Sequence, residues 1–227
     1  MMPIILLICT FILVYMCLYY KVNIKTVFIL KIITSFCFVA MGFITYFKSE
    51  ANNSNYPVLI IAGLISGFFG DIALGLRRVK PKRKNEYFIL GIILFFSGHI
   101  FYVVAFLSYA AYKLYWYFIV GIIITIVIII TMKLIGVKSN KSKYFNYLYV
   151  SLLSLIVAIT FLNMAHAFTQ INIILAIGAI LFMISDLLLY FIYFGETSVT
   201  KSKVIKMINI VTYYIAQMLF ALSIYYL

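Results

Sequence analysis

The stretch LISGFFGDIALGLRR, residues 64–78, places one acid, Asp71, inside an apolar run that ends in two arginines. No basic residue lies within five positions of Asp71 on either side. Apolar runs of about 20 residues are typical of helices that cross a membrane. A carboxylate inside such a helix is costly and rare. The stretch therefore indicates a membrane-spanning helix with an acid that needs an explanation.

The composition extends this interpretation to the whole chain. Of its 227 residues, 67% are hydrophobic and only 10% are charged, with a mean hydropathy of +1.17. Soluble domains carry about 25% charged residues. We therefore expect an all-α fold, a single integral-membrane domain over residues 1–227 with eight transmembrane helices. The apolar runs that predict these helices are about 3–20, 26–47, 58–76, 87–111, 114–132, 145–168, 171–194 and 207–226.

The basic residues predict the orientation of these helices. All but two of the 18 Lys and Arg residues fall in or beside the first, third, fifth and seventh connections, and the exceptions are Lys48 and Lys113. Connections rich in Lys and Arg face the cytoplasm. We therefore expect a multi-pass protein of the cell membrane with both termini on the non-cytoplasmic side. The net charge of +13 then reflects topology signals that also meet anionic lipid headgroups, and we expect no nucleic-acid partner.

Two acids lie inside predicted helices, Asp71 and Asp186. Intramembrane acids mark functional sites more often than structural ones. Gly63, Gly67 and Gly75 are spaced by four with Asp71, which puts them on one stripe of the third helix. Small residues at this spacing let another helix approach closely. We therefore expect Asp71 to point into the bundle rather than into lipid.

Other polar residues reach a similar depth. Lys31, one turn inside the second helix, is either a snorkelling lysine or a partner for a lipid phosphate. We expect it to bind or orient a substrate together with five residues of the fourth and eighth helices: His99, Tyr102, Tyr213, Tyr214 and Gln217. The third, fourth, seventh and eighth helices should bring Asp71 and Asp186 to one cavity in the cytoplasmic half. We expect His99 and Gln217 on the wall of that cavity.

Four segments carry a family resemblance. They are GDIALGL (70–76), FFSGHIFYVVAF (95–106), GAILFMISDLLLY (178–190) and TYYIAQMLF (212–220). In this order they resemble the successive signatures of the YhhN-like lysoplasmalogenase family of eight-helix membrane proteins, from about residue 25 to the end. Lys31 matches a lysine of the family pattern, although Ile32 follows where the family usually has proline. The resemblance implies hydrolysis of the vinyl ether bond of a membrane lysolipid, a lysoplasmalogen or related ether lysolipid, to a fatty aldehyde and a glycerophospho-head group.

The implied chemistry suits two buried carboxyl groups. A vinyl ether hydrolyses when an acid protonates its β-carbon and water attacks the resulting oxocarbenium ion. One carboxylic acid and one carboxylate fill these roles, as in glycosidases. We therefore expect Asp71 and Asp186 to be the catalytic pair, with either one as the acid. We expect neither a metal nor another cofactor, because Asp71, Asp186 and His99 would make a sparse ligand set.

Two other classes of function remain open from the sequence. A proton-coupled transporter of small molecules or lipids would also use intramembrane acids, as a proton relay. The chain lacks the paired broken helices and internal repeat that are typical of many such transporters. A non-catalytic membrane assembly protein is the other alternative. A lipid-shaped cavity open to one side would favour the hydrolase, and a path to both faces would favour transport.

Overall fold

The computed structural model describes residues 2–18, 23–49, 55–134, 143–194 and 202–227, and within them it is helical without strands. Two short 3-10 helices flank the long ones, η1 (Pro81–Arg83) before α4 and η3 (Ile224–Tyr226) after α8. The α-helices of the described residues are α1 (Met2–Leu18), α2 (Ile24–Lys48), α3 (Asn55–Val79), α4 (Lys84–Leu107), α5 (Leu114–Leu134), α6 (Lys143–His166), α7 (Gln170–Phe194) and α8 (Lys203–Ser223).

Seven of the described helices, α2 to α8, are long and apolar enough to cross a membrane. They confirm the prediction of an all-helical integral membrane bundle. The helix α1 is apolar as well, but it has 17 residues. At ~1.5 Å per residue it spans ~26 Å, which is less than the ~30 Å of a typical hydrocarbon core. The eighth span therefore stays a prediction.

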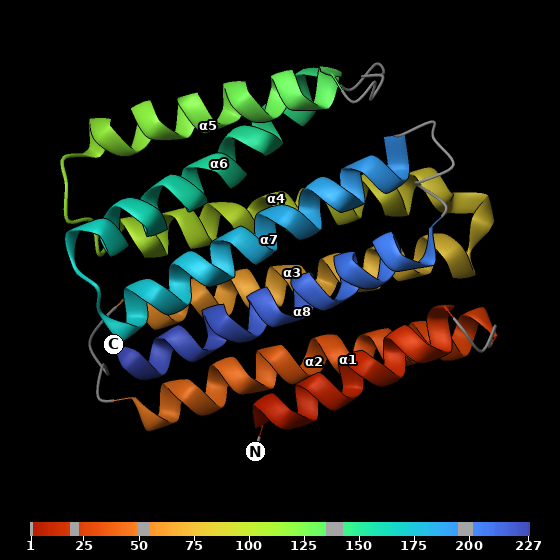
Figure 1. Cartoon of the computed structure of the whole chain (residues 1–227). Coiled ribbons are helices and arrows are strands. Elements are labelled where there is room, and N and C mark those ends of the chain that lie inside the picture. Colours follow the sequence, from red (N-terminus) through yellow and green to blue (C-terminus); the bar gives the residue numbers. More distant parts are fainter. Residues whose placement is uncertain (1, 19–22, 50–54, 135–142, 195–201) are drawn as a thin grey trace.

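The helices lie side by side as a bundle in which α5 and α1 occupy opposite flanks (Figure 1). The most extensive packing joins α3 to α4 and α7 to α8, and α2 contacts α1, α3 and α8. Aromatic rings fill the centre between α4, α7 and α8. The ring of Tyr102 lies 4.8 Å from that of Phe220, and Phe182 is 5.6 Å from Phe220, centroid to centroid. This packing fixes the relative position of the helices that carry the polar residues.

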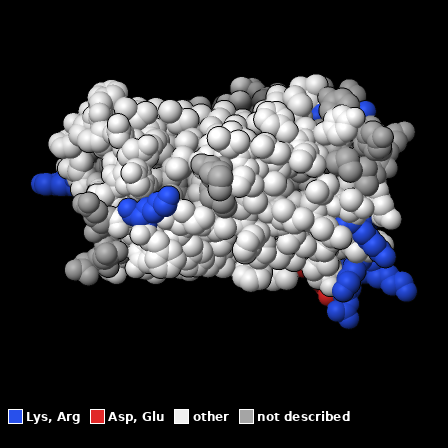
Figure 2. All heavy atoms as spheres, turned by 90° about the horizontal axis from the view of Figure 1, so that it is seen from below, with Lys and Arg blue, Asp and Glu red and all other residues white. Residues whose placement is uncertain are grey.

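Successive helices run in opposite directions through the bundle (Figure 1). The last turns of α1, α3, α5 and α7 share one end with the first turns of α2, α4, α6 and α8, and we call it the basic end. Arg77 and Arg78 close α3 there, and Lys82 and Arg83 lie in η1. Figure 2 shows Lys and Arg gathered mostly at this end, and a broad middle surface without charge. The arrangement agrees with the charge pattern of the sequence, whereas the side of the membrane that the basic end faces stays a prediction.

The glycine stripe of α3 makes room for side chains of three helices: Tyr102 of α4 lies against Gly63, Tyr213 of α8 near Gly67 and Phe28 of α2 against Gly75. The stripe also lets a neighbouring helix approach closely, as expected, because a Cβ on Gly98 of α4 would lie 3.3 Å from the Gly63 carbonyl oxygen. Asp71 shares the stripe and is 3% exposed, so its side chain lies inside the bundle.

Candidate functional site

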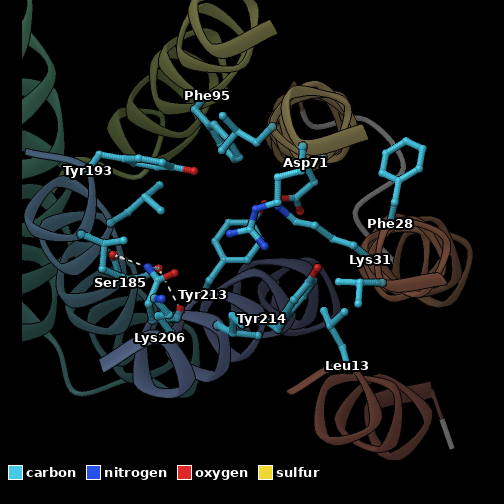
Figure 3. A pocket seen from close by; sticks show the side chains of 18 of the residues that line it. Leu13, Phe28, Lys31, Asp71, Phe95, Ser185, Tyr193, Lys206, Tyr213 and Tyr214 are labelled. Carbon is cyan, nitrogen blue, oxygen red and sulfur yellow. Dashed lines mark hydrogen bonds and ion pairs between the residues drawn. The ribbon is translucent and has the colours of Figure 1, made fainter. Parts of the chain in front are cut away.

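A cavity of about 380 Å³ opens among the helices near the basic end. Its lining comes from the first turns of α2 and α8 and the last turns of α3 and α7, with Leu13 from α1 and Phe95 from α4. Asp71 and Asp186, 115 positions apart in the sequence, both line it. Figure 3 shows the side chains of Lys31 and Asp71 directed toward one another at its wall, with Tyr213 and Tyr214 nearby. The cavity therefore extends to α1 and α2, beyond the helices expected from the sequence.

Asp71 is surrounded by donors. The Lys31 ammonium lies 2.8 Å from Oδ1, and the Ser35 hydroxyl donates to Oδ2 at 2.7 Å. The Tyr214 hydroxyl lies 3.0 Å from Ser35 Oγ, and because Ser35 gives its proton to Asp71, Tyr214 is the donor of that second bond. An ion pair on one carboxylate oxygen and a hydrogen bond on the other therefore fix the Asp71 side chain.

Asp186 has the opposite surroundings. The Tyr149 hydroxyl donates to its Oδ2 at 2.6 Å, and His99 Nε2 lies 3.2 Å from the same oxygen. His99 Nδ1 lies 2.5 Å from the carbonyl oxygen of Phe95, which only accepts, so Nδ1 carries a proton. In a neutral ring Nε2 is then an acceptor facing a carboxylate oxygen, which is repulsive. A proton placed on either Nε2 or Asp186 would remove this repulsion.

The contact between His99 and Asp186 is short but not aligned. Nε2 makes no hydrogen bond of good geometry with any described residue, although Asp186 Oδ2 lies 3.2 Å away. The imidazole is fixed from both sides, stacked on Phe182 at 5.0 Å and set edge-on to Tyr149 at 4.8 Å, centroid to centroid. A contact without hydrogen-bond geometry is weaker than a linear hydrogen bond.

Three expected site residues do not reach the cavity surface. His99, Tyr102 and Gln217 are each 1% exposed and none of them lines the cavity, so the expectation that His99 and Gln217 form its wall is wrong. The backbone of Phe95 holds His99, and the ring of Phe95 lines the cavity in its place. The Tyr102 hydroxyl donates to Gln217 Oε1 at 2.6 Å, which joins α4 to α8 behind the cavity.

Tyr213 is the member of this layer that reaches the cavity, although its side chain is buried. Its hydroxyl makes no hydrogen bond of good geometry with the described residues. The Asp71 carboxyl group lies close enough to interact with this hydroxyl. A Cβ on Gly67 would lie 3.2 Å from this hydroxyl and 3.1 Å from Gln217 Nε2, so the glycine leaves the space that both groups need. The hydroxyl therefore lies beside Asp71 at the cavity wall.

A second, smaller cavity of about 70 Å³ lies between α4, α6 and α7. Its lining is almost entirely apolar and includes Ile92, Val150 and Leu153. Asp186 and Phe95 line both cavities, so they stand where a polar space meets an apolar one. This arrangement fits a molecule with one polar and one hydrocarbon end.

The sequence analysis missed three polar residues of the site. Ser35 follows Lys31 by one helical turn, and Asn209 precedes Tyr213 by one, so a search for neighbours on the same face would have found both. Asn209 donates to the Ser185 carbonyl at 2.6 Å and lines the cavity. Tyr149 had no such signal, because it is one of 20 tyrosines in the chain.

Comparison with known proteins places these features in a family. The chain matches the YhhN family over residues 26–224. The match covers all four quoted segments and the helices that carry the two aspartates. Neither the curated proteins nor the solved structures contain a significant match. The family match spans most of the chain, and on that ground the protein belongs to the YhhN family.

Proposed function

We propose that this protein is a membrane-embedded hydrolase that cleaves the vinyl ether bond of a lysoplasmalogen or a related ether lysolipid. The products are a fatty aldehyde and a glycerophospho-head group. The observation that carries the proposal is the contrast between two carboxyl groups of one cavity. Asp71 is bound by an ammonium and a donated hydroxyl, whereas Asp186 contacts a ring nitrogen of His99. We assign the carboxylate role to Asp71, and we assign one shared proton to Asp186 and His99. Acid hydrolysis of a vinyl ether needs one group of each kind.

The two cavities support a lipid with a single chain as the substrate. The larger space, near the basic end, has charged and polar groups in its wall. The smaller one is apolar, and Asp186 lies at the wall of both. The vinyl ether of a lysoplasmalogen stands between the polar glycerophosphate and the hydrocarbon chain. A lipid that spans both spaces brings this bond to Asp186.

The first chemical step assigns the acid. The proton shared by Asp186 and His99 passes to the β-carbon of the vinyl ether, and the C=C electron pair forms the new C–H bond. The cation that results carries its charge on the adjacent carbon and the ether oxygen. Oδ1 of Asp186 has no hydrogen-bond partner among the described residues, so it is the oxygen free to face the substrate. Asp71 and the Asp186 carboxylate stabilise the cation electrostatically.

The second step assigns the base. A water molecule attacks the cationic carbon while Asp71 takes one of its protons, which gives a hemiacetal. The Tyr213 hydroxyl, which lies beside Asp71 at the cavity wall, is placed to hold this water. Collapse of the hemiacetal breaks its bond to the glycerol oxygen, which takes up a proton, and releases the aldehyde. Two protons are released in this step, one from the hemiacetal hydroxyl and one from Asp71. One of them ends on the glycerol hydroxyl, and the other restores the proton of the Asp186–His99 pair.

The position of the larger cavity supports hydrolysis over proton-coupled transport. Its lining residues belong to the halves of α2, α3, α7 and α8 that lie nearest the basic end. A transporter has to expose its site alternately to both faces of the membrane. A hydrolase that draws lipid from one leaflet needs access from one side alone.

The experiment is an aldehyde assay on the purified protein in nonionic detergent. A 1-alkenyl lysophospholipid should release fatty aldehyde, whereas a 1-acyl lysophospholipid and a 1-alkyl ether lysophospholipid of the same chain length should remain intact. The saturated ether is the matched control, because it has the same shape but cannot be protonated at carbon. Fatty acid release from the acyl lipid without aldehyde release from the alkenyl lipid would contradict the proposal. Cleavage of none of the three lipids by folded protein would contradict it as well.

A further inference from the structure

We propose that Arg78 and Lys206 form a phosphate-binding site at the outer part of the larger cavity. Arg78 lies in the last turn of α3 and Lys206 in the first turn of α8, and both line the cavity. The sequence alone presents them as two of many topology signals. Topology signals do not need to converge on one cavity from helices that are more than a hundred residues apart. The inference rests on the proposed function only for the kind of lipid that carries the phosphate.

The charge balance of the cavity wall points to an anion. The lining residues include three cations, Lys31, Arg78 and Lys206, and two acids. Lys31 is already paired with Asp71, and Asp186 already faces His99. Within the described part of the chain, neither Arg78 nor Lys206 is paired with an acid. Two unpaired cations at one cavity attract a group with negative charge, and an arginine fork matches the oxygens of a phosphate.

The neighbouring arginine shows that this arrangement is particular to Arg78. The guanidinium of Arg77 lies over the rings of Phe88 and Tyr193, 4.5 and 4.6 Å from their centroids. It packs on aromatic residues at the bundle surface and does not line the cavity. Arg78, one position further, turns toward the cavity. Two adjacent arginines thus have different roles, one in packing and one in the cavity wall.

The spacing fits a glycerophospho-lipid. Arg78 follows Asp71 by seven residues on α3, and Lys206 precedes Tyr213 by seven on α8. Seven residues, or two turns of helix, rise ~10 Å. Arg78 therefore lies ~10 Å nearer the basic end than Asp71, and Lys206 lies ~10 Å nearer it than Tyr213. In a lysophospholipid the phosphate is separated from the sn-1 ether by the glycerol carbons. A lipid with its ether beside Asp71 and Asp186 therefore extends its phosphate toward Arg78 and Lys206. Figure 3 shows Lys206 on α8 at the cavity wall.

This site changes the role expected of Lys31. The sequence offered Lys31 as the partner for a lipid phosphate, whereas its ammonium is bound to Asp71 at 2.8 Å. A phosphate that took Lys31 would leave a buried carboxylate unpaired, which is costly. Arg78 is exposed and Lys206 half-buried, so both bind an anion at smaller desolvation cost. In this proposal Lys31 pairs with Asp71, and Arg78 and Lys206 bind the phosphate.

The test measures binding rather than turnover. The probe is a 1-alkyl ether lysophosphatidylcholine, which has the head group but no cleavable vinyl ether, and the comparison ligand is the 1-alkylglycerol of the same chain length. Wild-type protein in nonionic detergent should bind the phosphate-bearing lipid at least ~10-fold more tightly. The R78Q/K206Q double variant should lose this preference, with affinity for the alkylglycerol unchanged. The matched control is K80Q/K82Q, which removes two charges from the adjacent segment without touching the cavity lining and should keep the preference.

Each outcome of this test is decisive. Equal affinity of the wild type for the two lipids, or a preference that survives in R78Q/K206Q, would overturn the phosphate site. Binding of inorganic phosphate alone as tight as that of the lipid would make it a free-phosphate site and overturn the lipid assignment. A preference that is lost in R78Q/K206Q but kept in K80Q/K82Q supports the site even if no aldehyde is formed. Aldehyde formation without any phosphate preference would leave the hydrolase proposal intact and remove this one.

Discussion

Lys31 and Asp71 form an ion pair between α2 and α3, with Nζ 2.8 Å from Oδ1 and only 4% of the aspartate side chain exposed. Ser35, one turn from Lys31 on α2, donates to the other carboxylate oxygen. Both contacts come from one face of α2, so this helix holds both oxygens of the acid. The pair therefore connects the packing of α2 on α3 with the chemistry proposed for the cavity.

The first prediction concerns this ion pair. Replacing Lys31 by Gln removes the ammonium that holds Oδ1 of Asp71, so the carboxylate proposed to take a proton from water loses the contact that positions it. We expect kcat for aldehyde release to fall ~10-fold or more, with little change in KM. Lys25→Gln, an exposed lysine of the same helix, is the control and should behave as wild type. A Lys31→Gln protein with raised KM and unchanged kcat would instead assign Lys31 to substrate binding.

The second prediction tests the donor to Asp186. Tyr149→Phe removes the 2.6 Å hydrogen bond to Oδ2 but keeps the ring that packs on His99. Without this donor, Asp186 and His99 no longer hold the proposed shared proton in the same geometry. We therefore expect kcat to fall ~10-fold, with little loss of thermal stability. The control is Tyr46→Phe, at the other end of α2 from the cavity. A Tyr149→Phe protein with wild-type kcat would exclude this hydroxyl from the proton-holding group.

The third prediction uses the space beside Gly67. In Gly67→Ala the new Cβ lies 3.1 Å from Gln217 Nε2 and 3.2 Å from the Tyr213 hydroxyl, so these groups have to move by a few tenths of an ångström. If Tyr213 holds the attacking water, kcat should fall severalfold while the unfolding temperature changes little. Gly121→Ala is the matched control, because its Cβ meets Leu155 on α6 at an ordinary 3.4 Å, away from the site. Equal loss of activity in both variants would show general disturbance of packing rather than a role for Tyr213.

The fourth prediction concerns orientation. Lys82 lies in η1 at the basic end, which we expect to face the cytoplasm, and Lys113 lies at the opposite end, before α5. In a protein without its three native cysteines, a membrane-impermeant thiol reagent should label Lys113→Cys in intact cells. It should label Lys82→Cys only after the membrane is opened. The reverse pattern would place both the basic end and the cavity on the outer side.

The sequence predicted the architecture better than the site. Apolar runs and the loop charges gave seven of the observed helices and their alternation, because burial in lipid demands length and apolarity that are visible in one dimension. The two aspartates stood out because acids are rare in such runs. Helical spacing shows which face a residue occupies, but not how deep in the bundle it ends. His99 and Gln217 were therefore expected at the cavity wall, and they lie behind it.

The partners of the aspartates were harder to predict. Ser35 and Tyr149 are uncharged residues of ordinary types, and only the packing of α2 on α3 and of α6 on α7 brings their hydroxyls to the acids. Arg78 and Lys206 could not be singled out for a different reason. They are two of 18 basic residues, most of which the membrane topology already explains. A basic residue near a helix end is explained by topology, so a second role in ligand binding becomes visible only when the fold shows which cavity it lines.

The rate of aldehyde release by Asp71→Asn, Asp186→Asn and the double variant tests the central claim most directly. Asparagine keeps the size of each side chain but neither takes nor gives a proton, so each single change should lower kcat by ~100-fold or more. Because the two groups act in one reaction as acid and base, the double variant should lose little beyond either single variant. All three proteins should still bind the 1-alkyl ether lysophospholipid, which shows that the cavity is intact. Folded single variants that release aldehyde at near wild-type rates would contradict the account and leave the two aspartates with a structural role.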